Sequence, residues 1–174
     1  MFTFSSPRDR DRLLREIELL AAALLRLEYR IATVESCTGG SVAAMFTELP
    51  GSSAWFDRGF VTYSNAAKED MVGVRTETLR DYGAVSEQAA LEMALGGVVH
   101  SAANCAVSIT GVAGPGGGSA VKPVGMVCFA WAGFSSEALS ETRYFAGDRH
   151  SVREQSVVFS IHKALKLLDI NSPD

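Results

Sequence analysis

Three residues with nucleophilic side chains stand together where a short β-branched run meets a segment of helical composition. Ile31-Ala-Thr-Val-Glu35 is followed by Ser36-Cys-Thr-Gly-Gly40 and then by a helix-like segment over residues 41–49. A strand that turns into a helix leaves backbone N–H groups unpaired at the turn, and such groups bind anions or oxyanions. The same pattern is typical of a capped turn in which the hydroxyls satisfy helix N–H groups and the thiol packs in the core. The pattern alone is compatible with both interpretations.

A serine nucleophile needs a base, and Lys68 is the candidate that the spacing favours. It closes the motif Tyr63-Ser-Asn-Ala-Ala-Lys68, which follows the next expected strand and so occupies the equivalent junction of the next strand–helix unit. Burial or a neighbouring cation lowers the pKa of a lysine from about 10.4 in water and makes its neutral amine available as a base. The plainer alternative is a solvated lysine on an exposed helix face beside Glu69 and Asp70.

Two further segments are candidates for binding an anion. The glycine-rich stretch over residues 110–123 lacks the Gly-Lys-Ser/Thr ending of a Walker A loop, so it does not indicate nucleoside-triphosphate binding. Its N–H groups suit an oxyanion or phosphate, whereas the alternative is a flexible surface connection. Arg149 and Arg153 stand one helical turn apart at the expected start of the last helix, and arginine suits bidentate phosphate recognition. Surface ion pairs with Asp148 and Glu154 are the competing interpretation.

The elements that must position these residues alternate along the chain. Hydrophobic periodicity, caps and turn residues predict helices over residues 7–27, 41–49, 65–73, 76–82 and 86–103, and a last helix that begins at Asp148 or Ser151 and ends near residue 168. They predict strands over residues 31–35, 59–63, 105–109, 124–131 and 139–145. The last two strands are separated by a short connection, which predicts an antiparallel hairpin. This order predicts an α/β fold, a three-layer α/β/α sandwich whose helices cover a mixed sheet of about five strands.

Length and composition bound the class of protein. The 174 residues are 47% hydrophobic and 21% charged, which is typical of a globular protein, and we expect one domain over residues 1–174. A formal net charge of -4 provides no general basic field, so we expect no nucleic-acid partner. The longest apolar run, residues 19–25, is much shorter than the roughly 18 residues of a membrane span, and we expect a cytoplasmic protein that binds no membrane. The apolar content also predicts a homo-oligomer.

Neither the cysteines nor the histidines form a pattern typical of a metal site. The 3 cysteines have no C-x-x-C spacing, and the 3 histidines are scattered along the chain, with no H-x-x-x-H or H-E-x-x-H arrangement. We therefore expect no disulfide framework, no metal and no cofactor.

Taken together, six segments resemble the CinA C-terminal domain family, whose enzymatically active members are nicotinamide mononucleotide deamidases, also called nicotinamide-nucleotide amidohydrolases. The resemblance covers the chain from about residue 10 to residue 168, and the segments that carry it are Glu35–Gly40, Tyr63–Lys68, Gly83–Glu87, Thr110–Gly118, Lys122–Gly125 and Phe145–Arg149. It implies hydrolysis of the carboxamide of nicotinamide mononucleotide to nicotinic acid mononucleotide and ammonia, a salvage step in pyridine nucleotide metabolism. No cofactor or metal is implied.

The resemblance also implies a role for each matched residue. Ser36 would attack the amide carbon, Lys68 would accept its proton, and Tyr63 would orient one of the two. The residues implied to bind substrate include an oxyanion corner, two pocket residues after the third strand and a phosphate-binding arginine, namely Thr38, Gly39, Gly40, Thr110, Gly111 and Arg149. Arg153 is a weaker match for the phosphate.

Two departures from the family pattern and two alternatives accompany this expectation. The family often has Glu where this chain has Ala66, which changes the environment of Lys68. It often has Thr-Pro-Glu where this chain has Ser119-Ala120-Val121, which changes the loop conformation.

Cys37 is an alternative nucleophile, as in thiol amidases. The alternative function, suggested by the family name, is a catalytically silent nucleotide-binding or interaction module linked to competence or DNA damage.

Overall fold

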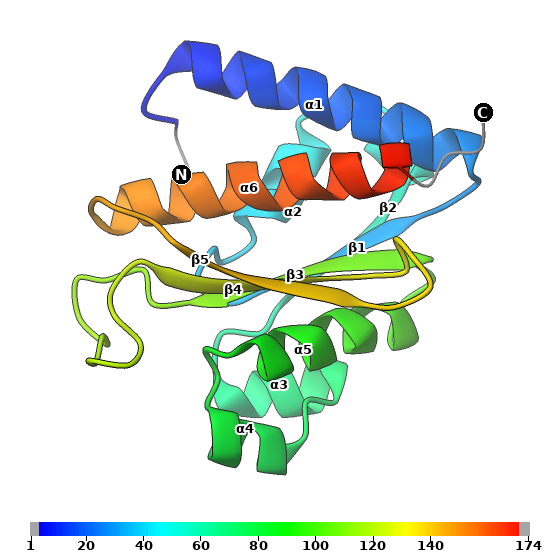
Figure 1. Ribbon diagram of the computed structural model, residues 1–174. Coiled ribbons are helices and arrows are strands. Elements are labelled where there is room, and N and C mark those ends of the chain that lie inside the picture. Colours follow the sequence, from blue (N-terminus) through cyan, green and yellow to red (C-terminus); the bar gives the residue numbers. More distant parts are fainter. Residues whose placement is uncertain (1–3, 171–174) are drawn as a thin grey trace.

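The computed structural model describes residues 4–170, which form three layers around a central sheet (Figure 1). The sheet has the strand order β2-β1-β3-β4-β5. Its strands are β1 (Ile31–Glu35), β2 (Phe56–Val61), β3 (Cys105–Gly111), β4 (Met126–Ala132) and β5 (Leu139–Tyr144). The first three run parallel, whereas β4 pairs antiparallel with both β3 and β5. The expected α/β sandwich, its mixed sheet and its terminal hairpin are thus confirmed.

Helices cover both faces of this sheet (Figure 1). One layer contains α1 (Pro7–Arg26), α2 (Ser41–Thr47) and α6 (Arg149–Ile170). The other contains α3 (Asn65–Val72), α4 (Thr76–Tyr82) and α5 (Glu87–Val99), and a short 3-10 turn, η1 (Ser52–Ala54), precedes β2. Within residues 4–170, no helix has the length and apolar character needed to cross a membrane.

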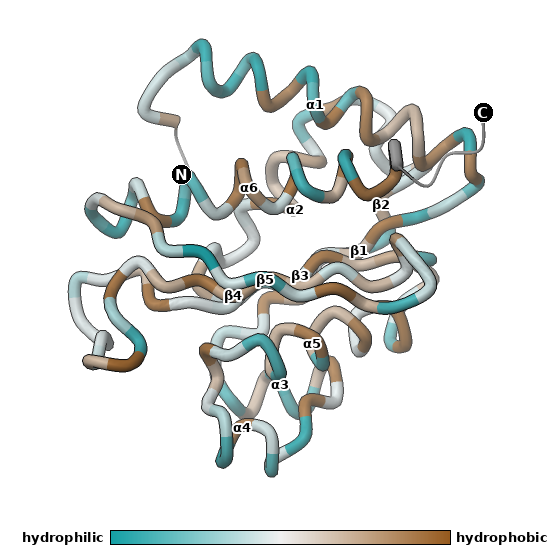
Figure 2. Tube along the Cα trace, in the orientation of Figure 1, coloured by the Kyte–Doolittle hydropathy of each residue, from teal (hydrophilic) through white to brown (hydrophobic). Residues whose placement is uncertain are grey.

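The two faces of the sheet are packed differently because β4 alternates large and small side chains. Phe129 and Trp131 join the cluster under α1 and α6, while Cys128 and Ala130 pack with small residues of α5. The large side chains fill the wider layer, and the small ones let α5 approach the sheet closely. Figure 2 shows hydrophobic residues in the middle of the molecule, between the two helix layers, and hydrophilic residues along the outer side of α1.

The structure corrects the position of β2, which was expected over residues 59–63 and lies at Phe56–Val61. The prediction took Gly59 as the first residue of the strand, although glycine is disfavoured inside strands. In the structure Gly59 lies within β2, where a Cβ atom would stand 2.9 Å from Thr33 Oγ1 and 3.0 Å from Ala43 Cβ. The glycine is therefore needed for close packing against β1 and α2.

The topology brings the candidate residues to one edge of the sheet. Because β1, β2 and β3 are parallel, their carboxyl ends meet there, and the segments that begin at Ser36, Thr62 and Val112 leave the sheet at this edge. Because β5 is antiparallel to β4, it runs in the same direction as β3 and ends at the same edge. The start of α6, which follows β5, therefore lies beside these segments.

Candidate active site

Ser36 and Lys68 lie in direct contact at the carboxyl edge of the sheet. Lys68 Nζ lies 3.0 Å from Ser36 Oγ, in a hydrogen bond, and donates a second one to the carbonyl of Thr62 at 2.7 Å. Both side chains are buried, with exposed fractions of 8% for Ser36 and 1% for Lys68. Burial lowers the pKa of Lys68. The alternative of a solvated lysine on an exposed helix face is therefore wrong.

Lys68 reaches Ser36 because of how α3 begins. Ser64 caps the helix, and its side-chain oxygen accepts a hydrogen bond from the Ala67 N–H at 3.0 Å. Lys68 follows one turn later on the side of α3 that faces the sheet, where Val72 is also buried. The helix thus directs a long side chain back along the carboxyl edge toward β1.

The turn after Ser36 depends on two glycines with left-handed backbone conformations. Gly39 has φ 62° and Gly40 has φ 89°, values that other residues rarely adopt. The Gly39 N–H donates to the Ser36 carbonyl at 3.1 Å and so is already engaged. Within residues 4–170, the N–H groups of Thr38 and Gly40 have no hydrogen-bond partner. These two groups are the donors that the turn leaves for a ligand.

Glu35 holds the start of α2, a role that the sequence analysis did not assign. Its carboxylate accepts hydrogen bonds from the Val42 N–H at 3.1 Å and the Ala43 N–H at 2.9 Å. Its exposed fraction is 1%, so these two N–H groups compensate the burial of a charged group. The signal in the sequence was a carboxylate at the end of a short β-branched strand.

Arg153 binds the same turn from the opposite side. It donates from Nε to the Cys37 carbonyl at 3.2 Å, and from one terminal nitrogen to the Thr38 carbonyl at 2.8 Å and to Ser41 Oγ at 3.1 Å. Ser41 Oγ in turn donates to the Thr38 carbonyl at 2.6 Å. The sequence analysis treated Arg153 only as a weaker candidate for a phosphate, whereas the structure places it against the turn that carries Ser36.

Arg149 lies beside a cavity of about 660 Å³ at the start of α6. It donates to the Gly114 carbonyl at 3.0 Å and contacts the Tyr63 hydroxyl at 3.5 Å. The cavity lining combines the glycine-rich loop with the first residues of α6, namely Gly114, Pro115, Val124, Gly147, Asp148, Arg149, His150 and Arg153. Ser36 and Lys68 are outside this lining, and Arg153 connects the cavity to their turn.

Tyr63 lies with Arg149 rather than with the Ser36–Lys68 pair. Its side chain is 63% exposed, and its hydroxyl contacts Arg149. Among the described residues, no hydrogen bond joins the Tyr63 hydroxyl to Ser36 or Lys68. The structure therefore adds no contact through which Tyr63 would orient either residue.

Thr110 and Gly111 are held by the fold instead of lining this cavity. The Thr110 hydroxyl donates to the Ala84 carbonyl at 2.7 Å, and the side chain is buried. A Cβ atom at Gly111 would stand 2.8 Å from Val127 Cγ2, so the glycine allows β3 and β4 to pair closely. The expectation that both residues line the pocket is not met at this cavity.

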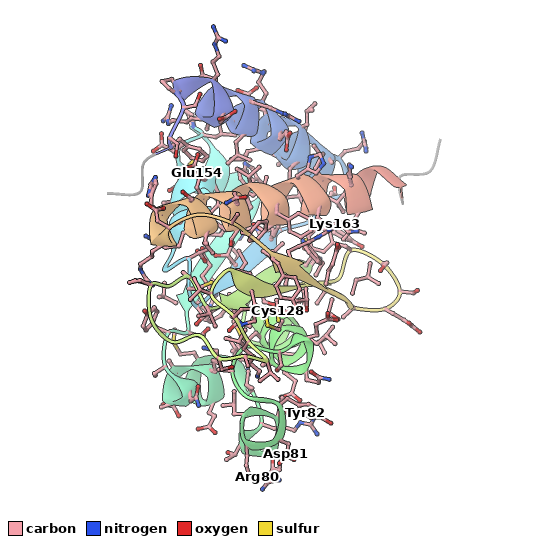
Figure 3. The ribbon with its side chains drawn as sticks, turned by 60° about the vertical axis from the view of Figure 1, so that its left-hand side comes forward. Arg80, Asp81, Tyr82, Cys128, Glu154 and Lys163 are labelled. Atoms are coloured by element: carbon pink, nitrogen blue, oxygen red, sulfur yellow. The ribbon has the colours of Figure 1, made fainter. Side chains whose placement is uncertain are left out.

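The glycine-rich loop is tied to α4 by Lys122. Lys122 Nζ donates to the Tyr82 carbonyl at 2.5 Å, at the end of the helix whose Tyr82 is labelled in Figure 3. Lysines near a helix C-terminus bind its last carbonyls in this way. The loop thus has an anchor on the opposite side of the sheet from α6.

The thiol of Cys37 is buried, and burial raises its pKa to about 12. A thiol in this state carries almost no thiolate near neutral pH, which disfavours Cys37 as the nucleophile. The packing of Cys37 in the core agrees with the interpretation of a buried cysteine. Residues 4–170 contain no group of three or more His, Cys, Asp and Glu side chains arranged to hold a metal ion.

The fold is a mixed α/β sheet with a buried serine–lysine pair at its carboxyl edge. The chain belongs to the CinA C-terminal domain family, whose model matches residues 15–168. This confirms the resemblance found in the sequence.

Relatives and solved structures agree with this assignment. The chain is 55% identical over 148 residues to the nicotinamide-nucleotide amidohydrolase PncC of Enterobacter agglomerans, covering 84% of this chain and 90% of that protein. It is 51% identical over 144 residues to the protein of the same name from Escherichia coli strain K12, covering 83% and 87%. A crystal structure of the competence/damage inducible protein CihA from Agrobacterium tumefaciens superposes with a TM-score of 0.86 at 46% identity, covering 96% of this chain and 99% of that one.

Proposed function

We propose that the protein hydrolyses the carboxamide of nicotinamide mononucleotide to nicotinic acid mononucleotide and ammonia, with Ser36 as nucleophile and Lys68 as base. The observation that carries the proposal is the 3.0 Å contact between Lys68 Nζ and Ser36 Oγ in a buried setting. The reaction would be a salvage step that converts an amide nucleotide into an acid nucleotide.

The class of enzyme rests on the relatives. Two proteins named nicotinamide-nucleotide amidohydrolase share 55% and 51% of their residues with this chain over most of both lengths. The expectation of an amidohydrolase is confirmed at that level. The assignment of Ser36 and Lys68 as the catalytic pair, and of the roles of the other residues, is part of the proposal.

The proposed acylation begins with Lys68 as a neutral amine. Thr62 accepts one N–H of Lys68, so the nitrogen lone pair is available to accept the Ser36 proton. The Ser36 oxygen then attacks the amide carbon, and the tetrahedral intermediate collapses as Lys68 returns the proton to the departing nitrogen. Ammonia leaves, and Ser36 carries the acyl group as an ester.

Deacylation uses the same two residues in reverse. Water attacks the ester carbon while Lys68 accepts one of its protons, and that proton returns to Ser36 as the acid product departs. In both steps the negative oxygen needs donors, and the unpaired N–H groups of Thr38 and Gly40 support an oxyanion site there. Removing one such donor from an enzyme typically lowers turnover about 10²–10³-fold.

Arg149 is the proposed ligand of the substrate phosphate. It lines a cavity of about 660 Å³, a volume suited to a small-molecule ligand. Its guanidinium is exposed, and it donates to Gly114 in the glycine-rich loop, so a bound phosphate would connect α6 with that loop.

The proposal is tested by incubating the purified protein with nicotinamide mononucleotide and measuring both products. We expect ammonia and nicotinic acid mononucleotide to appear in equal amounts without added metal. Binding of the nucleotide with no turnover over hours would instead support the silent module linked to competence or DNA damage. Turnover of other amides but not of this nucleotide would contradict the proposed substrate.

A further inference from the structure

Arg153 contacts the Ser36 turn at three acceptors, although it lies 116 residues away from Cys37 in the sequence. Its Nε and one terminal nitrogen reach the carbonyls of Cys37 and Thr38 and the hydroxyl of Ser41. These contacts use three of the five N–H groups that a guanidinium provides. A large part of the donor capacity of Arg153 is therefore directed at the protein backbone.

We propose that Arg153 is a positioning residue of the hydrolysis, which holds the turn carrying Ser36 and its oxyanion donor. This inference rests on the proposed function for its catalytic consequence, and it differs from a phosphate-binding role. Both arginines line the cavity, but Arg149, one helical turn earlier on α6, donates to the glycine-rich loop, whereas Arg153 donates to the turn. The first turns of α6 thus carry one arginine for the phosphate, Arg149, and one for the turn, Arg153.

The geometry of the peptide bond explains how Arg153 acts on the oxyanion donor. In a planar trans peptide the carbonyl and the following N–H point in opposite directions. Arg153 binds the Cys37 carbonyl, so the Thr38 N–H points away from the arginine. It also binds the Thr38 carbonyl, which directs the Gly39 N–H away toward its partner, the Ser36 carbonyl. One side chain thereby sets the orientation of two successive peptide groups.

The flexibility of the two glycines gives such a clamp a function. Gly39 and Gly40 both have positive φ values, and glycine gains more conformational freedom than other residues when a turn opens. Ser41 adds to the clamp because it accepts from Arg153 and donates to the Thr38 carbonyl. A lysine provides a point charge in place of the planar fork, so it would bind some of these acceptors but not all three in the same geometry.

The first test measures the turn itself and does not depend on activity. Amide hydrogen exchange of Gly39 is followed in the wild type, in Arg153→Ala and in Arg153→Lys, with Arg80→Ala as control. Figure 3 shows Arg80 on α4, across the sheet from α6, where it pairs with Asp81. We expect exchange at Gly39 to be at least about 10-fold faster in Arg153→Ala, intermediate in Arg153→Lys and unchanged in Arg80→Ala. Unchanged exchange in Arg153→Ala would overturn the proposal.

The second test separates positioning from phosphate binding. Kinetics are measured with nicotinamide mononucleotide and with the nucleoside that lacks its phosphate. We expect Arg153→Ala to lower kcat about 10²–10³-fold for both substrates, as loss of an oxyanion donor does, with the nucleotide-to-nucleoside ratio of kcat/KM within about 3-fold of wild type. Arg153→Lys should recover part of kcat. A selective loss for the nucleotide with kcat preserved would show a phosphate ligand and overturn the proposal.

The two tests also separate this inference from the proposed function. If the wild type hydrolyses neither substrate, the proposed function fails, and the exchange data still decide whether Arg153 holds the turn. If Arg153→Ala does not fold, as judged by its thermal transition, Arg153→Lys is used for both measurements. In that case wild-type exchange and wild-type kcat in the lysine variant would overturn the proposal.

Discussion

Lys68 contacts Ser36 from within the core, with the amine nitrogen 3.0 Å from the serine oxygen and the lysine 1% exposed. A lysine buried to this extent loses hydration that favours its charged form, so its pKa falls. The pair therefore combines contact with the nucleophile and a lowered pKa, the two properties that a general base requires.

Replacing Lys68 by methionine should abolish hydrolysis while preserving the fold. Methionine fills a similar volume without an amine, and loss of a general base typically lowers the rate about 10²–10⁴-fold. Measurement of kcat together with the thermal transition checks both parts. Asp70→Ala, an exposed change on the same helix, is the matched control. Activity of Lys68→Met within tenfold of the control would contradict the assigned role.

The lowered pKa of Lys68 predicts a pH dependence of stability as well as of activity. Between the lowered value in the folded protein and the ordinary value of 10.5, the unfolded chain binds the proton that the folded chain has released. The free energy of unfolding contributed by this site therefore rises with pH across that window. Urea unfolding at several pH values should show this rise in the wild type and not in Lys68→Met. Parallel profiles for both proteins would be inconsistent with a depressed pKa.

The kcat/KM of the wild type should rise as the pH passes through the lowered pKa of Lys68 and stay level above it, because only neutral Lys68 accepts the Ser36 proton. We expect a plateau that begins below pH 10.5. A rate that is independent of pH up to 10.5, or that falls as Lys68 loses its proton, would argue against a neutral amine as base.

The sequence predicted most elements and the nearness of Ser36 to Lys68, and the reasons for its errors are local. The strand expected to begin at Gly59 begins at Phe56, and Gly59 lies inside it, where it packs closely against Thr33. The acidic neighbours of Lys68 in the sequence indicated an exposed position. Its burial depends on the direction of α3 relative to β1, which determines which face of α3 packs against the sheet. The spacing of the motifs made Lys68 a candidate base, and the resemblance to the family implied the same role.

The roles of Glu35 and Arg153 were not predicted because each depends on contacts that spacing does not encode. Glu35 binds N–H groups seven and eight residues ahead, across a turn whose shape depends on two left-handed glycines. Arg153 reaches the turn because α6 packs over the sheet, an arrangement that the spacing of residues does not reveal. Tyr63 was assigned by resemblance alone, and the structure places its hydroxyl beside Arg149.

Replacing Glu35 by alanine should destabilise the protein through the loss of the two hydrogen bonds at the start of α2. Two N–H groups would lose a charged acceptor, and a cap of this kind contributes about 0.5–2 kcal/mol. A loss of about 2 kcal/mol corresponds to a fall in Tm of roughly 4–8 °C for a chain of this size. Glu35→Gln, which keeps one acceptor oxygen, should lose less. Equal Tm values for wild type and Glu35→Ala would contradict the assigned contacts.

Replacing Cys37 by alanine should leave hydrolysis within a few-fold of wild type. The pKa of about 12 leaves almost no thiolate, and the buried side chain is poorly accessible to reagents. Iodoacetamide should therefore leave the wild-type activity unchanged as well. Inactivation by the reagent that disappears in Cys37→Ala, together with loss of activity in that variant, would instead support a thiol mechanism.

Tyr63→Phe distinguishes two roles of the tyrosine. If its hydroxyl only contacts Arg149, as in the structure, kcat should change less than about tenfold and KM for the nucleotide should rise modestly. If it orients Ser36 or Lys68, as the family resemblance implies, kcat should fall much further with KM unchanged. Steady-state kinetics with the nucleotide decide between them, and we expect the first result.

The central claim is that Ser36 is the nucleophile, and ammonia release from nicotinamide mononucleotide by Ser36→Ala tests it most directly. The variant removes one buried oxygen and keeps the contact between Lys68 and the Thr62 carbonyl, so the fold and the nucleotide affinity should persist. We predict a rate at least about 10³-fold below wild type, with binding of the nucleotide still measurable. Release of ammonia by Ser36→Ala at a rate close to that of the wild type would contradict the account.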